Sequence, residues 1–387
     1  MDSIFSVPTK IHFGIGKIET LTDIAKEYGK RCLLVTTKNT HPLEKVFTRL
    51  KGVLSQNNFE VIHFDEVIPN PTTEIVEKGI RLLQDNKIDF VISVGGGSSI
   101  DTAKIICLLN ESKDIDWSNL FDKYNNPHIH YKPIHNRHIP LIAIPTTAGT
   151  GSEVTQAAVI SIDNDKNTIF HPLNYPAHAI LDPNLLLTLP SKLTASTGFD
   201  AFCHAFESYI NPMASPFSEL ASLEAIKVIK NYLPKSIESL NNIFYRKQLL
   251  YAQTLAGIAL SNAGASAPHP LSEIIGGVTG ISHGEALALV FPEFLHMQYH
   301  LNTTKFATIA RIFDNTLNSL SDKEAASKLS SIIKDFLKAI KLYHKFDDYS
   351  VTDEQFSSII DSPILNFLSF GCKENLQKII LDSKNLR

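Results

Sequence analysis

The sequence predicts two domains, an α/β domain with a parallel sheet followed by an all-helical domain. The first half alternates short apolar runs with helical patterns, which is typical of a parallel sheet covered by helices. From about Pro190 onward the chain shows helical periodicity and few strand-like runs. Its 387 residues suffice for two domains of ordinary size. We expect residues 1–185 to form the first domain and residues 186–387 the second, with the boundary near the turn at Asp182-Pro183-Asn184.

Four apolar runs in the first half are predicted to be strands. They are Arg31–Thr37, Glu60–Val67, Ile88–Val94 and Pro140–Thr146. A helical pattern over Thr73–Asn86 lies between the second and the third run. Strands joined by helical crossovers run parallel, so these four runs predict a parallel sheet.

Three segments of the second half have helical periodicity, namely Leu220–Leu233, Arg246–Asn262 and Ala325–Tyr343. Ser215 and Pro216 precede the first of them. Serine at the N-cap with proline at the first helical position is a common helix start. We therefore expect this helix to begin at Pro216.

The composition predicts a globular protein of the cytoplasm. A net charge of -4 gives no general attraction to nucleic acid or to anionic membranes. No apolar stretch is long enough to span a bilayer. The first residues, MDSIFSVPTK, lack a basic start followed by an apolar core, so we expect no secretory signal. The four cysteines are scattered without a CxxC pair, which favours a reducing compartment.

A glycine-rich turn follows the predicted strand Ile88–Val94. The segment Gly95-Gly96-Gly97-Ser98 opens a helix, so its backbone can approach a pyrophosphate closely. The helix N-terminus adds unpaired N–H groups and a positive dipole end. The pattern is not the usual GxGxxG fingerprint, and a tight turn that needs positive φ is the alternative explanation. Its place at the carboxyl end of a strand favours phosphate binding.

A second loop with similar properties follows the next predicted strand. The segment Ile144–Glu153 (IPTTAGTGSE) is rich in small residues and hydroxyls, which suit the wall of a nicotinamide or ribose site. A Ser/Thr turn without a ligand is the alternative. Two such loops in one domain favour a cofactor site over two unrelated turns.

Asp200 and His204 lie in a helical pattern and are four residues apart, so they share one face of the helix. A pair of this kind is more often a surface salt bridge than a metal chelate. Here Phe199, Phe202 and Phe206 surround it, and such a helix is expected to be buried. Buried charges need partners or a metal.

Two further histidines are candidates for the same metal, His269 and His283. Gly276, Gly277 and Gly280 lie between them and are expected to break the helix there, so the two side chains would come from different elements. Three imidazoles and one carboxylate suit Fe²⁺ or Zn²⁺ and suit Mg²⁺ or Ca²⁺ poorly. A closed tetrahedral Zn²⁺ site would be structural, whereas Fe²⁺ accepts further ligands, so Fe²⁺ is favoured.

Five stretches of the chain match one known family, in order. They are Val94–Lys104 (VGGGSSIDTAK), Ile144–Thr155 (IPTTAGTGSEVT), Leu193–Glu207 (LTASTGFDAFCHAFE), Leu250–Gly264 (LYAQTLAGIALSNAG) and His283–Leu289 (HGEALAL). On these motifs the chain resembles the iron-containing (group III) alcohol dehydrogenases. The resemblance extends from Pro8 to about His296, and the remaining C-terminal residues match only loosely.

The resemblance implies a Rossmann-like dinucleotide-binding α/β domain and an all-helical metal-binding domain. It implies an NAD(P)-dependent oxidoreductase that interconverts an alcohol and an aldehyde or ketone by hydride transfer, with Fe²⁺ or Zn²⁺ polarising the substrate oxygen. It also implies a cytoplasmic homodimer or larger homo-oligomer. The metal ligands that it assigns are Asp200, His204, His269 and His283. The cofactor-binding residues that it assigns are Thr37, Asn70, Gly96, Gly97, Ser98, Asp101, Thr146, Thr147 and Thr150.

The chain departs from this family after its first core strand. Many NAD-preferring members have an aspartate there that binds the ribose hydroxyls. Here the sequence has Thr37, which cannot repel a 2′-phosphate, followed by Lys38, which can attract one. NAD and NADP both remain candidates, with NADP slightly favoured.

A second departure lies four residues after His269. Many family members have another histidine there, close to the nicotinamide and the substrate, and this chain has Glu273. One hypothesis is that Glu273 orients the substrate or relays a proton. The alternative is a structural carboxylate that pairs with a neighbouring cation.

The nearest rival function is that of a metal- and NAD-dependent lyase similar to dehydroquinate synthase. Such enzymes typically hold their metal with a glutamate and two histidines, which the pair of Asp200 and His204 does not match. The substrate stays open among primary alcohols, short diols, lactaldehyde-like aldehydes and hydroxy acids.

Overall fold

The computed structural model describes residues 3–129, 131–134, 137–162, 165–265, 268–366 and 372–384. Internal contacts divide the chain into two compact units. The first, here called the α/β unit, comprises Ser6–Leu189 and Asn241–Leu250. The second, here called the helical unit, comprises Met1–Phe5, Pro190–Leu240 and Tyr251–Arg387.

A six-stranded sheet with the order β1-β8-β5-β4-β2-β3 forms the centre of the α/β unit. Every neighbouring pair in it is parallel, as the alternating pattern predicted. The strands are β1 (Lys10–Phe13), β2 (Arg31–Thr37), β3 (Glu60–Val67), β4 (Phe90–Gly95), β5 (Leu141–Pro145) and β8 (His178–Leu181). Strands β4 and β5 are buried along their whole length, which explains their continuous apolar sequences.

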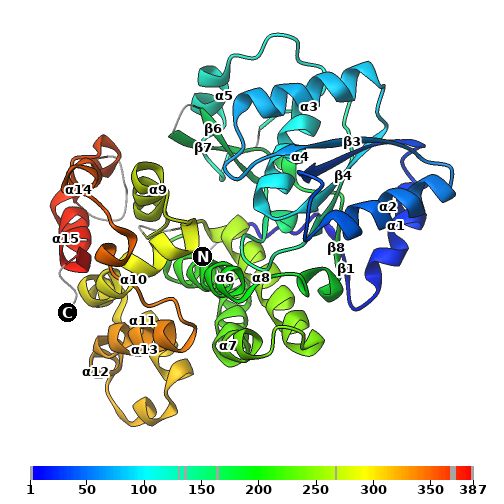
Figure 1. Ribbon diagram of the computed structural model, residues 1–387. Helices are drawn as coiled ribbons and strands as arrows, with labels where there is room; N and C mark the ends of the chain where they lie inside the picture. The colour runs from blue at the N-terminus through cyan, green and yellow to red at the C-terminus, as the bar shows by residue number, and fades with distance from the viewer. Residues whose placement is uncertain are drawn as a thin grey trace. The chain divides into compact units, whose positions relative to one another are not determined.

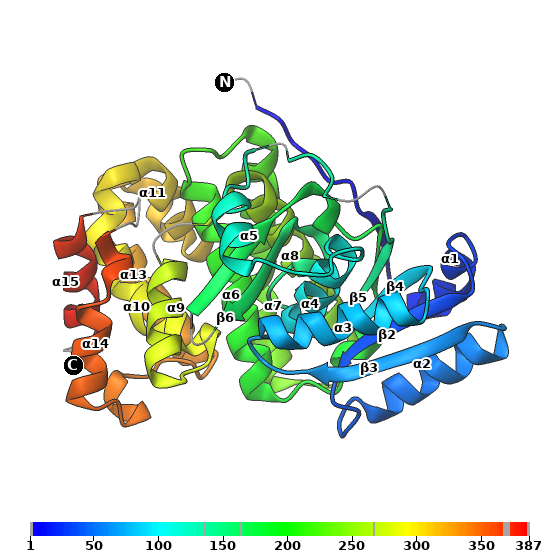
Figure 2. The same cartoon turned by 90° about the horizontal axis from the view of Figure 1, so that it is seen from above.

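Helices cover both faces of this sheet. Figures 1 and 2 show α3 and α4 on one face and α1 and α2 on the other. These helices are α1 (Leu21–Ala25), α2 (Glu44–Gln56), α3 (Thr73–Asp85) and α4 (Gly97–Leu108), and α5 (Trp117–Lys123) follows. Buried side chains such as Leu33, Ile80 and Ile106 join strands and helices in one apolar core.

An antiparallel hairpin supplements the α/β unit. It consists of β6 (Ala157–Ile162) and β7 (Asp165–Phe170), and β6 lies against α4. The sequence pattern does not predict this hairpin, because the DKNTIF sequence of β7 is mostly polar and only Ile169 is fully buried. Strands β1 and β8 were also missed, since each has only four residues.

The helical unit consists of helices and short connections in its described part. Its helices are α6 (Ser191–Ile210), α7 (Pro216–Glu238), the greater part of α8 (Ile243–Ala263), α9 (Pro268–Thr279), α10 (His283–Gln298), α11 (Thr303–Phe313), α12 (Asp322–Ser327), α13 (Leu329–Ala339), α14 (Asp353–Ile360) and α15 (Lys373–Lys384). Helix α7 begins at Pro216 with Ser215 as its N-cap, which confirms the predicted helix start.

Two helix predictions need correction. The predicted single helix Ala325–Tyr343 is two helices, α12 and α13, which meet at Lys328. The predicted break between His269 and His283 is present at Gly280, whose φ of 75° favours glycine, so the two histidines come from different helices. Gly276 and Gly277, which were expected to contribute to this break, lie inside α9. Two adjacent glycines inside a helix are tolerated when packing compensates for their low helix propensity.

The two units also differ from the simple division at residue 185. Residues 241–250 belong to the α/β unit, although they lie in the second half of the chain. Arg246 explains this, because its guanidinium is fully buried and donates to the carbonyl of Leu189 at 2.8 Å. A single boundary near residue 185 therefore does not account for residues 241–250, which follow it in the chain but belong to the α/β unit.

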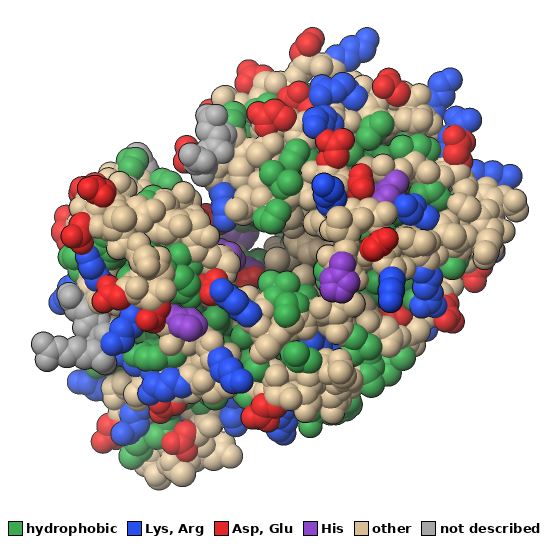
Figure 3. Space-filling model, viewed as in Figure 1, with side chains coloured by type: hydrophobic (Ala, Val, Ile, Leu, Met, Phe, Trp, Pro, Cys, Tyr) green, Lys and Arg blue, Asp and Glu red, His purple; other side chains and the backbone are tan. Residues whose placement is uncertain are grey.

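The surface carries both charge signs. Figure 3 shows Lys and Arg side chains interspersed with Asp and Glu side chains on the face that it presents. Of the helices in the described ranges, none combines the length and apolar character that a bilayer crossing requires.

Candidate functional site

Most of the predicted cofactor residues lie at the carboxyl ends of the strands of the parallel sheet. Strands β3, β2, β4 and β5 are consecutive neighbours, so their carboxyl ends meet at one edge. Thr37 ends β2, Gly96 and Gly97 follow β4, and Thr146 follows β5. Asn70 lies between β3 and α3, with a left-handed φ of 53°. Open parallel sheets bind ligands at this edge, where successive strands lead into separate loops.

The glycine-rich turn and the threonine-rich loop pack directly against each other. A Cβ on Gly97 would lie 2.8 Å from Cγ2 of Thr150, and a Cβ on Gly96 would lie 3.1 Å from Oγ1 of Thr147. A side chain at position 97 would therefore push the loop away. The glycines keep the N-terminus of α4 next to the threonine hydroxyls, which suits a ligand with a phosphate and a ribose.

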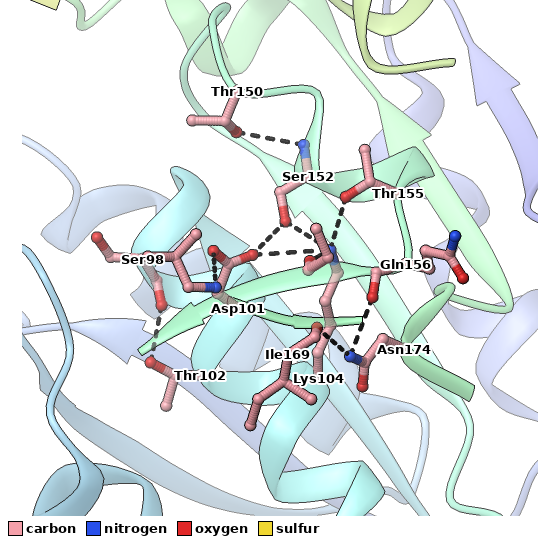
Figure 4. A network of polar contacts seen from close by, with 12 residues as sticks. Ser98, Asp101, Thr102, Lys104, Thr150, Ser152, Thr155, Gln156, Ile169 and Asn174 are labelled. Carbon is pink, nitrogen blue, oxygen red and sulfur yellow. Dashed lines mark hydrogen bonds and ion pairs between the residues drawn. The ribbon is translucent and has the colours of Figure 1, made fainter. Parts of the chain in front are cut away.

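Asp101, which the resemblance assigns to the cofactor site, is hydrogen-bonded within the protein. Ser98 lies half-buried in the first turn of α4, at the predicted phosphate position. The carboxylate of Asp101 instead accepts from Oγ of Ser152 at 2.5 Å and from the backbone N–H of Val159 at 3.0 Å. Figure 4 shows it directed at this loop. The geometry does not support Asp101 as a direct cofactor contact.

The predicted metal ligands gather in the helical unit, where α6, α9 and α10 lie side by side (Figure 1). Helix α6 carries Asp200, α9 carries His269 and α10 begins at His283. Nε2 of His269 and Nε2 of His283 each lie 3.4 Å from Oδ1 of Asp200. One potential ligand atom from each of the three residues lies within 4.8 Å of the others. Two consecutive helices, α9 and α10, thus meet α6, which lies far from them in sequence.

His204, the fourth predicted ligand, lies beside this group. Its Nδ1 is 3.7 Å from Oδ1 of Asp200, and its ring stacks on that of His269 with a centroid distance of 4.3 Å. It occupies the same face of α6 as Asp200, as the four-residue spacing predicted. Its role as a metal ligand stays a prediction.

Two residues that the sequence motifs did not indicate orient the histidines. Oε1 of Glu207, which is fully buried, lies 2.6 Å from Nδ1 of His269. Oγ of Ser272 donates to the carbonyl of His269 and lies 3.1 Å from Nδ1 of His283. Both Nδ1 atoms are therefore the donors in these bonds, which leaves both Nε2 atoms directed at the point that they share with Asp200. Glu207 follows Asp200 by seven residues, so the helical face shared with Asp200 and His204 was the available signal.

The site has the electrostatics of a cation site. Burial disfavours a charged imidazole, but Glu207 and Asp200 outweigh it and raise the pKa of His269 to about 10. Burial also disfavours an ionised Asp200, but the surrounding imidazoles hold the pKa of that carboxyl well below its usual range. Burial, with Glu207 and Asp200 nearby, raises the pKa of the Cys203 thiol, so Cys203 is a core residue here.

Two buried ligand atoms of the centre lack hydrogen-bond partners within the described residues. They are Oδ1 of Asp200 and Nε2 of His269. Buried polar atoms normally have partners, and an unsatisfied pair that faces a common point fits a bound cation. A carboxylate with two or three imidazoles suits Fe²⁺ or Zn²⁺, so the residues present fit the predicted metal.

Gly284 permits this convergence. A Cβ at this position would overlap the carbonyl oxygen of Ser196, which is backbone and cannot move aside. Only glycine therefore allows α10 to begin this close to α6. His283, the preceding residue, is thereby brought within reach of Asp200.

Glu273 lies one turn after His269 on α9 and is half-buried. The structure places both residues on the same helical face, as the spacing predicted. Across the described ranges, Glu273 forms no salt bridge or side-chain hydrogen bond, so the cation partner of the structural alternative is not seen there.

Comparisons with known proteins agree with this geometry. The family model for iron-containing alcohol dehydrogenase matches residues 8–183, and the model for the C-terminal domain of that family matches residues 194–378. The match thus continues well beyond His296, where the sequence resemblance was expected to weaken.

Named relatives cover nearly the whole chain. An NADPH-dependent butanol dehydrogenase of Clostridium saccharobutylicum is 31% identical over 92% of this chain and 89% of its own length. A 1,3-propanediol dehydrogenase of Klebsiella pneumoniae is 31% identical over 97% of this chain and 96% of its own. The solved structure of an alcohol dehydrogenase from Oenococcus oeni is 29% identical, with a TM-score of 0.90 over 99% of this chain and 100% of that one. The chain therefore belongs to the iron-containing alcohol dehydrogenase family and is an alcohol dehydrogenase.

Proposed function

We propose that this enzyme holds Fe²⁺, in preference to Zn²⁺, with Asp200, His204, His269 and His283, and binds NAD(P) at the carboxyl edge of its parallel sheet. The observation that carries the metal assignment is the pair of unsatisfied buried atoms on Asp200 and His269, which face one point together with His283. A cation held there would supply Lewis acidity to the substrate oxygen, and a bound nicotinamide would supply or accept the hydride.

The residues of the chain supply position and charge for this chemistry. Glu207 and Ser272 fix the ring orientations of His269 and His283 before any ligand arrives, which lowers the entropic cost of binding. The N-terminus of α4 offers backbone N–H groups to a phosphate, and the threonine hydroxyls next to it can bind a ribose.

A substrate panel under anaerobic conditions with added Fe²⁺ tests this function. The panel contains primary alcohols, short diols, lactaldehyde-like aldehydes and hydroxy acids, each with both NAD and NADP in the matching redox state. We expect a steady change in nicotinamide absorbance, because a dehydrogenase consumes its cofactor stoichiometrically. A product that forms without that change would instead support the lyase alternative.

Metal identity is tested by analysis and reconstitution. Protein purified without oxygen should contain close to one equivalent of iron per chain. Metal-free protein should regain more activity with Fe²⁺ than with Zn²⁺, since Fe²⁺ accepts ligands beyond the protein set more readily. Equal or higher activity with Zn²⁺ would reverse the assignment.

NADP is the slightly favoured cofactor. Thr37 ends β2 without a carboxylate, and the next residue, Lys38, is exposed. A cation beside an uncharged side chain suits a 2′-phosphate, whereas an aspartate would repel it. One relative reported above is NADPH-dependent by name, which is in line with this proposal. The ratio of kcat/KM for the two cofactors measures the preference directly.

Glu273 is proposed to orient the substrate or to relay a proton. It lies on the face of α9 that carries His269 and has no salt-bridge partner in the described ranges. Glu273→Gln keeps the shape and removes the charge, so kcat measured against pH should change its profile. A profile identical to that of the wild type would contradict the proposal.

The enzyme is further proposed to be a cytoplasmic homodimer or a larger homo-oligomer. Four scattered cysteines, three of them buried and unpaired, suit a reducing compartment. Light scattering coupled to gel filtration would give the mass in solution, and a mass equal to one 43.0 kDa chain would contradict the oligomer.

A further inference from the structure

Lys104 is a fully buried lysine in the middle of α4, and the proposed chemistry does not use it. Its Nζ donates to Oγ of Ser152 at 2.8 Å, to Oγ1 of Thr155 at 3.1 Å and to the carbonyl of Ala157 at 2.6 Å. An ammonium group has three donors, so these bonds saturate it. Ser152 belongs to the threonine-rich loop, and Thr155 and Ala157 lie in the segment that follows it.

Asp101, one turn earlier on α4, engages the same segment. Its two oxygens accept from Ser152 and from the backbone of Val159, and Oδ1 lies 3.6 Å from Nζ of Lys104. Figure 4 shows Asp101 and Lys104 converging on Ser152 from one face of α4. One helix thus holds the loop by both an anion and a cation.

The network leads back to the cofactor edge. The backbone N–H of Ser152 donates to Oγ1 of Thr150 at 3.2 Å. Thr150 in turn packs against Gly97, at the start of α4. The contacts therefore form a closed loop that starts and ends on α4 and passes through Ser152 and Thr150.

Stabilising a domain with a buried ion pair is energetically unfavourable compared with apolar packing. A buried ion pair is weak evidence for stability, because desolvation of both charges offsets most of their attraction. An apolar side chain of similar volume would fill the same space at a lower cost. The charged group has a geometric advantage instead. Its three directed hydrogen bonds fix the position of the loop, which apolar packing does not do.

We propose that Lys104, together with Asp101, is a positioning residue that sets the distance between the phosphate-binding turn and the threonine-rich loop and so determines the affinity for the dinucleotide. The inference rests on the proposed cofactor site. Neither side chain touches the ligand; both act through Ser152 and Thr150. Their removal should weaken binding of the dinucleotide and leave the metal centre intact, because that centre is built from α6, α9 and α10.

Lys104→Met tests the inference, since methionine fills a similar volume without the charge. Binding is measured directly, as the dissociation constant of NADPH and of NADH from fluorescence titration of the metal-loaded full chain. We expect at least about a tenfold weaker Kd, with unchanged metal content and with kcat at saturating cofactor reduced much less than kcat/KM. Asp101→Asn should weaken binding in the same direction, and the double variant should lose less than the sum of the two.

Asn110 provides the matched control. It is buried next to the end of α4 and donates to the carbonyls of Cys107 and Arg137, away from both loops. Asn110→Ala should lower the melting temperature without changing the Kd of the cofactor by more than about twofold. An equal loss of affinity in this control would show that general destabilisation is the cause and would overturn the inference.

The remaining outcomes separate the inference from the function on which it rests. If folded Lys104→Met binds both cofactors as tightly as the wild type, the positioning role is wrong and the proposed function stands. If the wild type binds neither cofactor, the proposed function is wrong, and the positioning role falls with it. Should Lys104→Met not fold, Asp101→Asn and Ser152→Ala carry the same test and keep Lys104. Asp101→Asn removes the negative charge beside Lys104, and Ser152→Ala removes the hydroxyl that joins Lys104 to Asp101.

Discussion

The two units of this enzyme bury charge in opposite ways. In the helical unit, Oδ1 of Asp200 and Nε2 of His269 are buried side by side without a hydrogen-bond partner in the described structure. In the α/β unit, the ammonium of Lys104 and the carboxylate of Asp101 are buried with every bond directed at another protein group. In the proposed function a cation completes the first arrangement, whereas the second is complete by itself.

This difference separates a binding centre from its scaffold. A buried charge with unsatisfied atoms is stable only when something else occupies the site. A buried charge with saturated bonds defines a geometry and is available to no ligand. Sequence alone does not distinguish the two, because the motifs GGGSSIDTAK and GFDAFCHAFE both combine charged and small residues.

The largest expected effect comes from removing the carboxylate charge of Asp200, which faces the proposed metal position. Asp200→Asn keeps the shape of the side chain and removes the anion that attracts the cation. We expect loss of bound metal and a fall in kcat/KM of at least about 1,000-fold, equivalent to about 4 kcal/mol. Metal analysis and steady-state kinetics on the same preparation check this.

Cys203→Ala is the control for this variant. Cys203 lies on the same buried helix, between two predicted ligands, and is a core residue. It should keep its metal while losing some stability. Full metal content in Asp200→Asn would show that the three histidines bind the metal without the carboxylate, and would contradict the predicted role of Asp200.

A smaller effect is expected for Glu207, which belongs to the binding centre and yet is bonded within the protein. Glu207→Gln can still accept from Nδ1 of His269 but no longer provides a negative charge. Loss of such a supporting carboxylate typically weakens metal binding about 10- to 100-fold. Competition with a chelator of known affinity measures this, and unchanged affinity would assign Glu207 to packing alone.

The sequence predicted the parts of the fold whose signal is local. Strands β2 and β3 have the predicted bounds, and α7 begins at the predicted Pro216, because apolar runs and caps are written in consecutive residues. Strand β7 was missed because its residues are mostly polar and only its pairing with β6 makes it a strand. The course of α9 through Gly276 and Gly277 was missed for a similar reason, since tertiary packing overrides low helix propensity.

The same limit applies to the site. The four-residue spacing of Asp200 and His204 is a local signal, and it was enough to indicate that they share a helical face. The bond from Glu207 to His269 joins residues 62 positions apart, and that from Ser152 to Asp101 joins residues 51 apart. Such partners are set by the packing of separate elements, so composition and periodicity suggest the candidates without pairing them.

Burial of Lys104 makes the stability of the α/β unit depend on pH. Burial lowers its pKa to about 8, against the opposing attraction of Asp101 and Glu153, which are the charged groups that face it. Between pH 8 and the ordinary value of 10.5, the folded protein holds fewer protons at this site than the unfolded chain. The free energy of unfolding attributable to Lys104 therefore rises with pH in that window, by up to about 1.4 kcal/mol per pH unit.

Denaturant unfolding of wild type and Lys104→Met at pH 8, 9 and 10 measures this slope, because titration of other groups largely cancels in the difference. Wild type should gain stability relative to the variant as the pH rises. A difference that stays constant with pH would mean that Lys104 keeps an ordinary affinity for its proton, and that its burial imposes no electrostatic cost.

The smallest effect is expected at Lys38, a charged residue of the α/β unit that is available to a ligand. Lys38 is exposed at the end of β2 and forms no salt bridge within the described residues, in contrast to the saturated Lys104. If it awaits a 2′-phosphate, Lys38→Ala should raise the KM for NADPH about two- to fivefold, as expected for an exposed ion pair. The KM for NADH serves as the internal control and should not move. Because an exposed pair is screened by salt, the NADPH effect should also shrink as ionic strength rises. An equal rise for both cofactors would place Lys38 at a part of the dinucleotide that NAD and NADP share, and the preference for NADP would then have to come from Thr37 alone.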